Sequence, residues 1–515
     1  MGWDWALYLQ LLGNSVELLW VIVPAVLFGI VIGALPGFSA SNTLIILLPL
    51  TLTMELDVAL AFMASVYASS HLGGGIPAIL VNMPGDGGAA ATTLDGYPMT
   101  LKGKGQQALV LCFVASTMGG LITSLATVAL LPYLAPIGLY LRSVDMVVVM
   151  VLGLVLIAAI ASDDLLKGLI AGFFGLMLGL IGTDHIYSTP RATFGFLELY
   201  DGIPIIAALI GLFAIAETFS MLERETIVPK TAVDHTRPRW ADTLDGLRLS
   251  AKYWWQTVWT AFLGMLIGIV PGAGASIASF VAYQQSRLFS KTPQLYGTGF
   301  APGVLAPESA NNGVTSGTLV PLMAIGVPGG ATSAVMMVVL QYQGIVLGPR
   351  LFLDTPELAY GVFFYMTMSY AVMLLTILPL ARYMSKVVFM PTRIIVPLII
   401  TLTIIGAFAN RDYLFDMGLA LVFAVLGYIA VKTNYHVIAI LIGVLLGPLF
   451  EQYLLRSLRL GQGDLMILFS STLGNVLWVM VVLSLFLPWL RSRQTQRALE
   501  KAGHTLPGGG RENVG

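Results

Sequence analysis

The sequence predicts an all-α polytopic membrane protein with about 12 transmembrane helices, additional broken or re-entrant segments, and two structural repeats. The first observation is composition: 57% of the 515 residues are hydrophobic, 10% are charged, and the mean hydropathy is +0.86. The second is a series of apolar runs long enough to cross a hydrocarbon layer of about 30 Å. The third is a Pro-Gly pair that recurs inside the apolar runs of both halves. A soluble globular protein is therefore excluded.

The apolar runs divide the chain into two membrane halves, residues 1–222 and 253–490. Runs in the first half lie near 17–35, 40–54, 58–82, 107–135, 144–162, 164–183 and 201–220. Runs in the second half lie near 254–285, 300–346, 358–381, 391–409, 413–431, 434–450 and 466–490. No Lys or Arg precedes Lys102, so the basic region of a cleaved signal is missing and we expect the first span to be retained.

Two polar segments complete the domain organisation. Residues 223–252 form a polar linker between the halves, and residues 491–515 form a basic and then Gly-rich tail. Basic residues near membrane spans favour the cytoplasmic side, so we expect both the linker and the C-terminus there.

Residue counts exclude several other functions. Cys112 is the only cysteine, which rules out an intramolecular disulfide and a cysteine metal cluster. The net charge is −1 and the basic residues are scattered, which argues against nucleic acid as a partner. No HExxH, GxSxG or Cys/His cluster is present, and the five histidines are dispersed, so we predict that the protein is not an enzyme.

Three collinear matches predict that the two halves are copies of one unit. GALPGFSAS at 33–41 matches GIVPGAGAS at 268–276, which lies 235 residues later. IPAILVNMPGDGGAAATT at 76–93 matches LVPLMAIGVPGGATSA at 319–334, with Pro84 on Pro328 at an offset of 244. SDDLLKGLIAGFFGLMLG at 162–179 matches NRDYLFDMGLALVFAVLG at 410–427 at an offset of 248. Each half thus carries two Pro-Gly breaks, and we favour an inverted arrangement of the copies.

Pro-Gly breaks inside apolar helices point to a binding site. Pro removes a hydrogen-bond donor, Gly permits unusual backbone angles, and the freed polar groups are tolerated at membrane depth only against protein or a watery cavity. Paired breaks at corresponding positions of two halves are typical of a transporter's midplane site. The Ser, Thr and Asn residues beside these breaks offer neutral oxygens and amides, which suit a small hydrated ion or a carboxylate.

Simpler interpretations compete with this one. The small-residue runs can be surfaces for close helix packing, and Ser or Thr can bond the carbonyls of its own helix. Glu308 is either a paired structural carboxylate or a coupling group, because an ionisable residue within a span is a functional candidate. His71 is either a proton relay or a polar residue near a Gly-rich bend.

Four stretches resemble the large permease subunit of the tripartite tricarboxylate transporter family, the TctA type. They are PGFSASNTLIILLPLT at 36–51, VNMPGDGGAAATTLDGYPM at 81–99, GIVPGAGASIASFVAY at 268–283 and APESANNGVTSGTLVPLMAIGVPG at 306–329. The resemblance implies a three-part system in the bacterial inner membrane: this permease, a small membrane subunit, and a periplasmic solute-binding protein. It also implies transport driven by a cation gradient, and no GxxxxGK[ST] phosphate loop is present. His71 and Leu72 depart from the Tyr and Gly expected in the family.

The resemblance and the breaks together imply cation-coupled uptake of a small di- or tricarboxylate. The breaks carry no Arg or Lys, so we expect main-chain amides, helix N-termini and hydroxyls to hold the anion. The expected substrate-binding residues are Gly37, Ser39, Ser41, Asn42, Asn82, Gly85, Thr92, Gly272, Gly274, Asn311, Asn312, Gly329, Thr332 and Ser333. The expected ligands of the coupling cation are Asn42, Thr93, Glu308, Asn312 and Thr332.

Several alternatives stay open at this point. No cofactor is expected beyond the coupling cation, which is Na⁺ or H⁺. A channel or a non-transporting membrane scaffold in the lipid bilayer is the alternative function, because channels also use broken helices. The sequence does not decide the identity of the carboxylate, the stoichiometry of coupling or the oligomeric state. It also does not decide between a rocking and an elevator movement.

Overall fold

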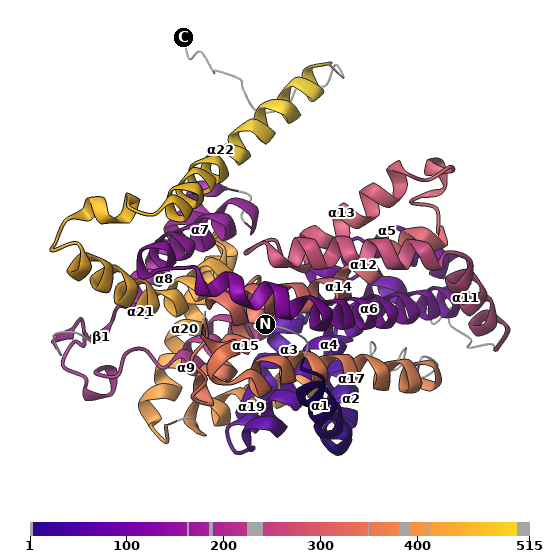
Figure 1. Cartoon of the computed structure of the whole chain (residues 1–515). Helices are drawn as coiled ribbons and strands as arrows, with labels where there is room; N and C mark the ends of the chain where they lie inside the picture. Colours follow the sequence, from indigo (N-terminus) through magenta and orange to yellow (C-terminus); the bar gives the residue numbers. More distant parts are fainter. Residues whose placement is uncertain are drawn as a thin grey trace, which may run out of the picture.

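The computed structural model describes residues 4–161, 164–184, 189–223, 240–348, 350–380, 392–409 and 411–501. Helices dominate this part of the chain, as the sequence predicts for an all-α membrane protein. The only strands in the described residues are β1 (Gly182–Thr183) and β2 (Pro190–Arg191), which pair antiparallel. Figure 1 shows the helices gathered into one bundle, from which the end of the last helix projects.

The described residues of the first half contain ten α-helices, and the second half starts after a short helix in the linker. The helices of the first half are α1 (Trp5–Glu17), α2 (Leu19–Gly33), α3 (Ala40–Thr51), α4 (Leu56–Val81), α5 (Thr93–Leu101), α6 (Gly105–Leu139), α7 (Ser143–Ala161), α8 (Leu165–Gly179), α9 (Ile205–Leu209) and α10 (Ala216–Leu222). A 3-10 turn, η1 (Gly87–Ala89), precedes α5, and a π-helical segment, η3 (Ile210–Ile215), joins α9 to α10. The short turn η2 (Leu197–Leu199) precedes α9.

The second half has its own series of helices. After α11 (Trp240–Lys252), its helices are α12 (Trp254–Ile269), α13 (Gly274–Leu288), α14 (Ala301–Ile325), α15 (Ala331–Tyr342), α16 (Leu351–Asp354), α17 (Pro356–Leu380), α19 (Thr392–Ala409), α20 (Leu414–Lys432), α21 (Val437–Leu460) and α22 (Thr472–Lys501). The turns η4 (Pro293–Leu295) and η5 (Leu465–Phe469) precede α14 and α22.

Five helical stretches of the described chain are long and apolar enough to cross a membrane alone. They are Gly105–Tyr133, Ile205–Leu222, Pro356–Thr376, Leu414–Lys432 and Val437–Leu460. The pair α1 and α2, bent by 67°, adds a sixth if it forms one broken span. The multi-pass membrane class is thus supported, while the expected number of about 12 spans stays a prediction. At about 1.5 Å per residue, the apolar helices α2 and α12, with 15 and 16 residues, are short for a bilayer.

Two helix pairs, α2 with α4 and α12 with α14, are packed through glycines at matching positions. Gly33 leaves no room for a Cβ against the main chain of Ser70, and Gly268 has the same relation to Val314. Gly29 likewise approaches the carbonyl oxygen of Val66, while the other pair has Gly264 against that of Ala310. These partners are related by the offsets of 235 and 244 found in the sequence. The duplication itself stays a prediction, and these matching contacts support it.

Several helices of one half pack against helices of the other. Helix α14 packs along α6, and α4 packs along α17. In addition, α8 packs on α21, and α20 packs on the segment α9–η3–α10. Gly179 approaches the carbonyl oxygen of Val444, and Gly427 approaches that of Leu212 in the corresponding pair. The halves are therefore interleaved, and each contributes helices to every side of the bundle (Figure 1).

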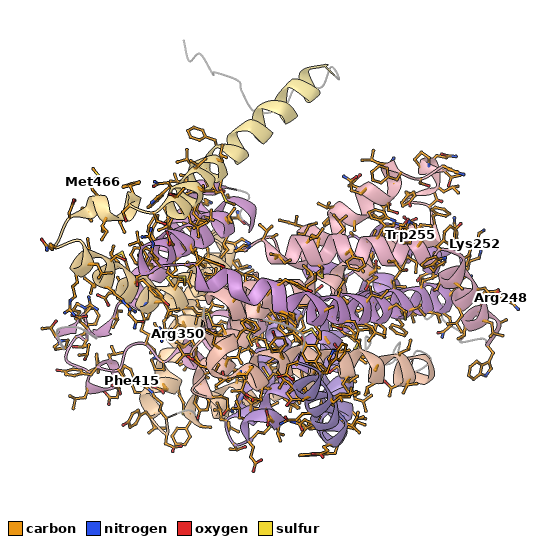
Figure 2. The ribbon with its side chains drawn as sticks, in the orientation of Figure 1. Arg248, Lys252, Trp255, Arg350, Phe415 and Met466 are labelled. Atoms are coloured by element: carbon orange, nitrogen blue, oxygen red, sulfur yellow. The ribbon has the colours of Figure 1, made fainter. Side chains whose placement is uncertain are left out.

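The polar linker and the tail are partly helical. Residues 224–239 of the linker lie outside the described residues, but residues 240–252 form α11, which packs on α6 through Gly246. Arg248 and Lys252 lie on α11 beside Trp255 of α12, at one edge of the molecule (Figure 2). Helix α22 continues to Lys501, into the segment expected to be a tail, and residues 502–515 lie outside the described residues.

Candidate functional site

The four Pro-Gly breaks interrupt the helices as the sequence predicts. The backbone geometry at each break of the first half is similar to that at the corresponding break of the second half. Gly37 and Gly272 both have left-handed backbone angles, with φ of +75° and +83°, which favour glycine. Helix α4 ends at left-handed Asn82 and α14 ends at left-handed Gly326. The Gly37 N–H donates to the Pro84 carbonyl over 3.3 Å, and the Gly272 N–H donates to the Gly329 carbonyl over 3.0 Å. Within each half, one break is thus hydrogen-bonded to the other.

Residues at or just after each of the four breaks line one cavity of about 270 Å³. Its wall contains Ser39–Ser41 from the first break, Asp86–Gly88 from the second, Gly272–Ile277 from the third and Gly330–Thr332 from the fourth. The remaining wall residues come from helices around the breaks: Tyr67, His71, Ile157, Val314, Thr318, His436 and Ile438. The Tyr67 hydroxyl and the Thr318 hydroxyl, 2.6 Å apart, join α4 to α14 at this wall. Segments separated by nearly 300 residues therefore share one pocket.

Four helices of twelve or more residues begin at the cavity, namely α3, α13, α15 and α21, but their first turns differ. Helix α3 is capped by Ser39, whose hydroxyl accepts from the Asn42 N–H at 3.2 Å. No N-cap side chain accepts from the first turn of α13, α15 or α21, and in α15 the Ser333 hydroxyl accepts from the Gly330 N–H at 2.9 Å. Uncapped first-turn N–H groups carry the positive end of the helix dipole and bind anions. The wall contains no Lys or Arg, and these N–H groups can supply positive potential there.

Two ionisable side chains meet in the first-half wall. The Nδ1 atom of His71 lies 3.3 Å from Oδ2 of Asp86 and 3.2 Å from Oδ1 of Asn311. The other Asp86 oxygen accepts from the Ala89 N–H at 2.9 Å and so caps the turn η1. His71 is 4% exposed, and its Nε2 atom has no hydrogen-bond partner among the described residues.

Five of the expected substrate-binding residues line the cavity: Ser39, Ser41, Gly272, Gly274 and Thr332. A second group shapes the breaks without lining the cavity: Gly37, Asn82, Gly85, Gly329 and Ser333. A third group is buried behind the wall: Asn42, Thr92, Asn311 and Asn312. Asn311 supports His71, and the Asn312 amide donates to the Ala68 carbonyl at 2.9 Å.

The expected cation ligands are not bonded to one another in the described structure. Glu308 is fully buried, and its two oxygens accept from the hydroxyls of Thr92 at 2.6 Å and Ser116 at 2.7 Å. The Thr93 hydroxyl donates to the Ala90 carbonyl, so it turns back toward the end of η1. Within the described ranges, the side-chain oxygens of Asn42 and Asn312 are buried and have no hydrogen-bond partner, which leaves them able to accept from a ligand or to coordinate a cation. Among the described residues no group of three or more His, Cys, Asp or Glu side chains gathers as a metal site.

Sequence reasoning missed several wall residues. Gly87, Gly88 and Gly330 lie inside the motifs that carry the breaks, within three residues of a Pro-Gly pair, so their position in the motif could have indicated them. Tyr67 and Thr318 lie within α4 and α14, well before the breaks, and only their helical spacing could have indicated them. His436 comes from the start of α21, more than 100 residues after the last break, and no local pattern marks it.

Comparison with known proteins identifies the family. The model of the tripartite tricarboxylate transporter TctA family matches residues 18–442. An uncharacterized 52.8 kDa protein in the TAR-I ttuC' 3' region of Agrobacterium vitis is 31% identical over 492 residues, which cover 95% of this chain and 97% of that protein. An uncharacterized protein in the TAR-II ttuC' 3' region of the same organism is 31% identical over 241 residues, 46% of this chain and 99% of that protein. No solved structure matches. The chain therefore belongs to the tripartite tricarboxylate transporter TctA family.

Proposed function

We propose that this protein is the conducting membrane subunit of a three-part uptake system for small di- or tricarboxylates. In this proposal a periplasmic solute-binding protein delivers the anion, a small membrane subunit completes the membrane complex, and a cation gradient across the bacterial inner membrane drives uptake. The family membership supports the transport class, while the coupling, the partners and the membrane are part of the proposal.

The cavity at the four breaks is the observation that carries this proposal. Its volume of about 270 Å³ lies just below the range of drug-sized ligand pockets, which suits a small polar solute. The uncapped N-termini of α13 and α15 offer main-chain N–H groups to a carboxylate. The hydroxyls of Ser41 and Thr332 lie in the same wall and can donate to a second oxygen.

Charge explains why uptake needs a coupling cation. Moving one negative charge into a cell against 100 mV costs about 2.3 kcal/mol, so a dicarboxylate requires at least two cations to enter without that cost. We assign the coupling role to Glu308 together with the buried amide oxygens of Asn42 and Asn312. Glu308 lies one helical turn before Asn312 on α14, and its carboxylate is already held by two hydroxyls.

Reconstituted transport tests the proposal. The chain, its small membrane partner and the binding protein would be purified, and the membrane components placed in liposomes with a Na⁺ or H⁺ gradient imposed separately. We expect saturable uptake of radiolabelled succinate or citrate that needs both the binding protein and one of the gradients. Liposomes without the chain and liposomes without a gradient serve as controls. Uptake that does not saturate and ignores both the gradient and the binding protein would identify a channel instead.

A further inference from the structure

His71 occupies a position in the cavity wall that fixes which of its nitrogens carries hydrogen. Its Nδ1 faces two oxygens, Oδ2 of Asp86 at 3.3 Å and Oδ1 of Asn311 at 3.2 Å. The Asn311 amide nitrogen donates to the main-chain carbonyl of His71 at 3.3 Å, which orients the amide so that its oxygen faces the ring. Because both neighbours of Nδ1 are acceptors, Nδ1 is the nitrogen that carries hydrogen in the neutral ring.

The opposite nitrogen then sets a condition on ligand binding. In the neutral ring Nε2 carries a lone pair, which repels a carboxylate oxygen. While Nδ1 keeps its hydrogen for Asp86 and Asn311, only the doubly protonated ring can donate from Nε2 to a carboxylate. Nε2 is buried and has no partner in the described part of the chain, so a ligand group is the partner that would satisfy it.

We infer that His71 takes up a proton when a ligand carboxylate binds at its Nε2, so that each anion enters the cavity together with one proton. The inference rests on the proposed function, because it assumes that the cavity holds the carboxylate. The proton comes from water on the side from which the ligand arrives and leaves with the ligand on the other side. No covalent bond of the ligand changes, and the proton makes the net charge of the occupied cavity one unit less negative than the ligand alone would make it.

The surroundings of His71 suit a transient positive charge. Asp86, at the start of η1, is the charged group in contact with the ring, and Tyr67 lies one turn earlier on α4 with its ring centroid 5.4 Å away. Behind the wall, Glu308 of α14 approaches Gly75 of α4 and is held by hydroxyls. Across the cavity, α13 and α15 present uncapped N-termini. A ligand with two carboxylates can thus bind His71 in the first half and main-chain N–H groups in the second.

Calorimetry on the purified full-length protein tests the inference. Succinate, malate and citrate would be titrated at pH 8, where these probes are ionised and free histidine is neutral. The measurement would be made in two buffers of different ionisation enthalpy, so that the difference in heat gives the number of protons exchanged. We expect the wild type to take up more than about half a proton per bound ligand, and its Kd to rise up to about tenfold per pH unit above pH 8.

Two variants assign the proton. In His71→Gln, the proton uptake should vanish and the Kd should rise about tenfold or more, while the thermal unfolding temperature stays near that of the wild type. In His235→Gln, which changes a histidine of the polar linker, the proton uptake should persist. If His71→Gln fails to fold, the pH dependence of the wild-type Kd decides alone.

The possible failures are distinguishable. Binding to the wild type without proton uptake, or proton uptake that persists in His71→Gln, overturns the inference and leaves the proposed function intact. Absence of binding by all three probes to the wild type, together with absence of uptake by the reconstituted system, overturns the proposed function and the inference with it.

Discussion

The second and fourth breaks have the same backbone environment but different chemistry. Gly85 lies against the Gly33 carbonyl oxygen and Gly74, and Gly329 lies against the Gly268 carbonyl oxygen and Thr318, which are the corresponding residues. The next residue is Asp86 in the first half and Gly330 in the second, and both are extended. Asp86 therefore fills the N-terminus of a short turn with a carboxylate, whereas Gly330 leaves the N-terminus of the twelve-residue α15 open.

This difference shows how two similar scaffolds can divide one task. The first half closes its helix N-termini with Ser39 and Asp86 and contributes an ionisable pair to the cavity. The second half leaves the N-termini of α13 and α15 uncapped and contributes main-chain N–H groups. In our proposal the second half binds one carboxylate of the ligand through main-chain N–H groups, and His71 of the first half binds the other and carries the proton. Exchanging features between the halves tests this division.

Copying the first-half carboxylate into the second half should have the largest effect. Gly330 is extended and a Cβ there would lie 3.5 Å from the Gly274 Cα, so Gly330→Asp can be accommodated. The new carboxylate would occupy the N-terminus of α15 and repel the ligand, and we expect a Kd at least about 100-fold higher for succinate. The measurement is calorimetric titration. Gly330→Asn has the same shape without the charge, and a similar loss in that variant would contradict the electrostatic explanation.

Adding a methyl group at either Pro-Gly break should affect both halves alike. A Cβ on Gly85 would lie 2.6 Å from the Gly74 Cα, and one on Gly329 would lie 2.9 Å from the Thr318 Cα. We expect Gly85→Ala and Gly329→Ala to reduce uptake by about tenfold to 100-fold, because overpacking costs about 1–3 kcal/mol and shifts the breaks. Membrane insertion should be unaffected. The matched control is Gly418→Ala on α20, where a Cβ meets nothing within 4 Å, and a loss of uptake there would undermine the comparison.

Glu308 has no counterpart on α4, where the matching position is Ala64. Replacement by Gln should leave binding within about threefold, because Glu308 does not line the cavity. Gradient-driven accumulation should be lost, because the Gln side chain cannot become charged. It also has only one acceptor oxygen, whereas each of the two Glu308 oxygens accepts a hydrogen bond from a hydroxyl. Accumulation and ligand exchange in liposomes would be compared, with exposed Glu357→Gln as the control. Full accumulation by Glu308→Gln would remove it from the coupling role.

Removal of the first-half cap should have the smallest effect on binding. In Ser39→Ala, the Asn42 N–H loses its acceptor, and the free energy of unfolding should fall by about 1 kcal/mol. The Kd for succinate should change by less than about threefold, since the anion is held by α13 and α15. Thermal unfolding and calorimetry measure the two quantities. A tenfold change in Kd would mean that α3 contributes to the anion site as strongly as the second-half helices.

The sequence could predict the breaks because Pro-Gly in an apolar run has few structural uses. The same reasoning indicated Ser39, Ser41 and Thr332, which lie within a few residues of a break and reach the cavity. It could not separate wall residues from their supports. Asn311 and Thr92 are as close to a motif as Thr332, but neither lines the cavity. The Asn311 side chain faces His71, and the Thr92 side chain faces Glu308.

Other features depend on packing that no local pattern records. The expected cation ligands Asn42, Thr93 and Glu308 lie on three different helices, and the structure gives each its own surroundings. The contribution of His436 depends on where α21 is anchored, which is set by its glycine contacts with α8. The number of spans was also hard to predict, because α4 and α14 are long enough to cross a membrane but carry many polar residues in the interior of the bundle.

The interleaving of the halves restricts how the molecule can move. Helix α8 packs on α21, and α20 packs on the α9–η3–α10 segment. Each of these two packed pairs has one member from residues 1–222 and one from residues 253–490. A hinge that swung residues 1–222 as one body against residues 253–490 would tear both pairs apart. Any large excursion during transport must therefore carry mixed groups of helices, and the linker cannot serve as its axis.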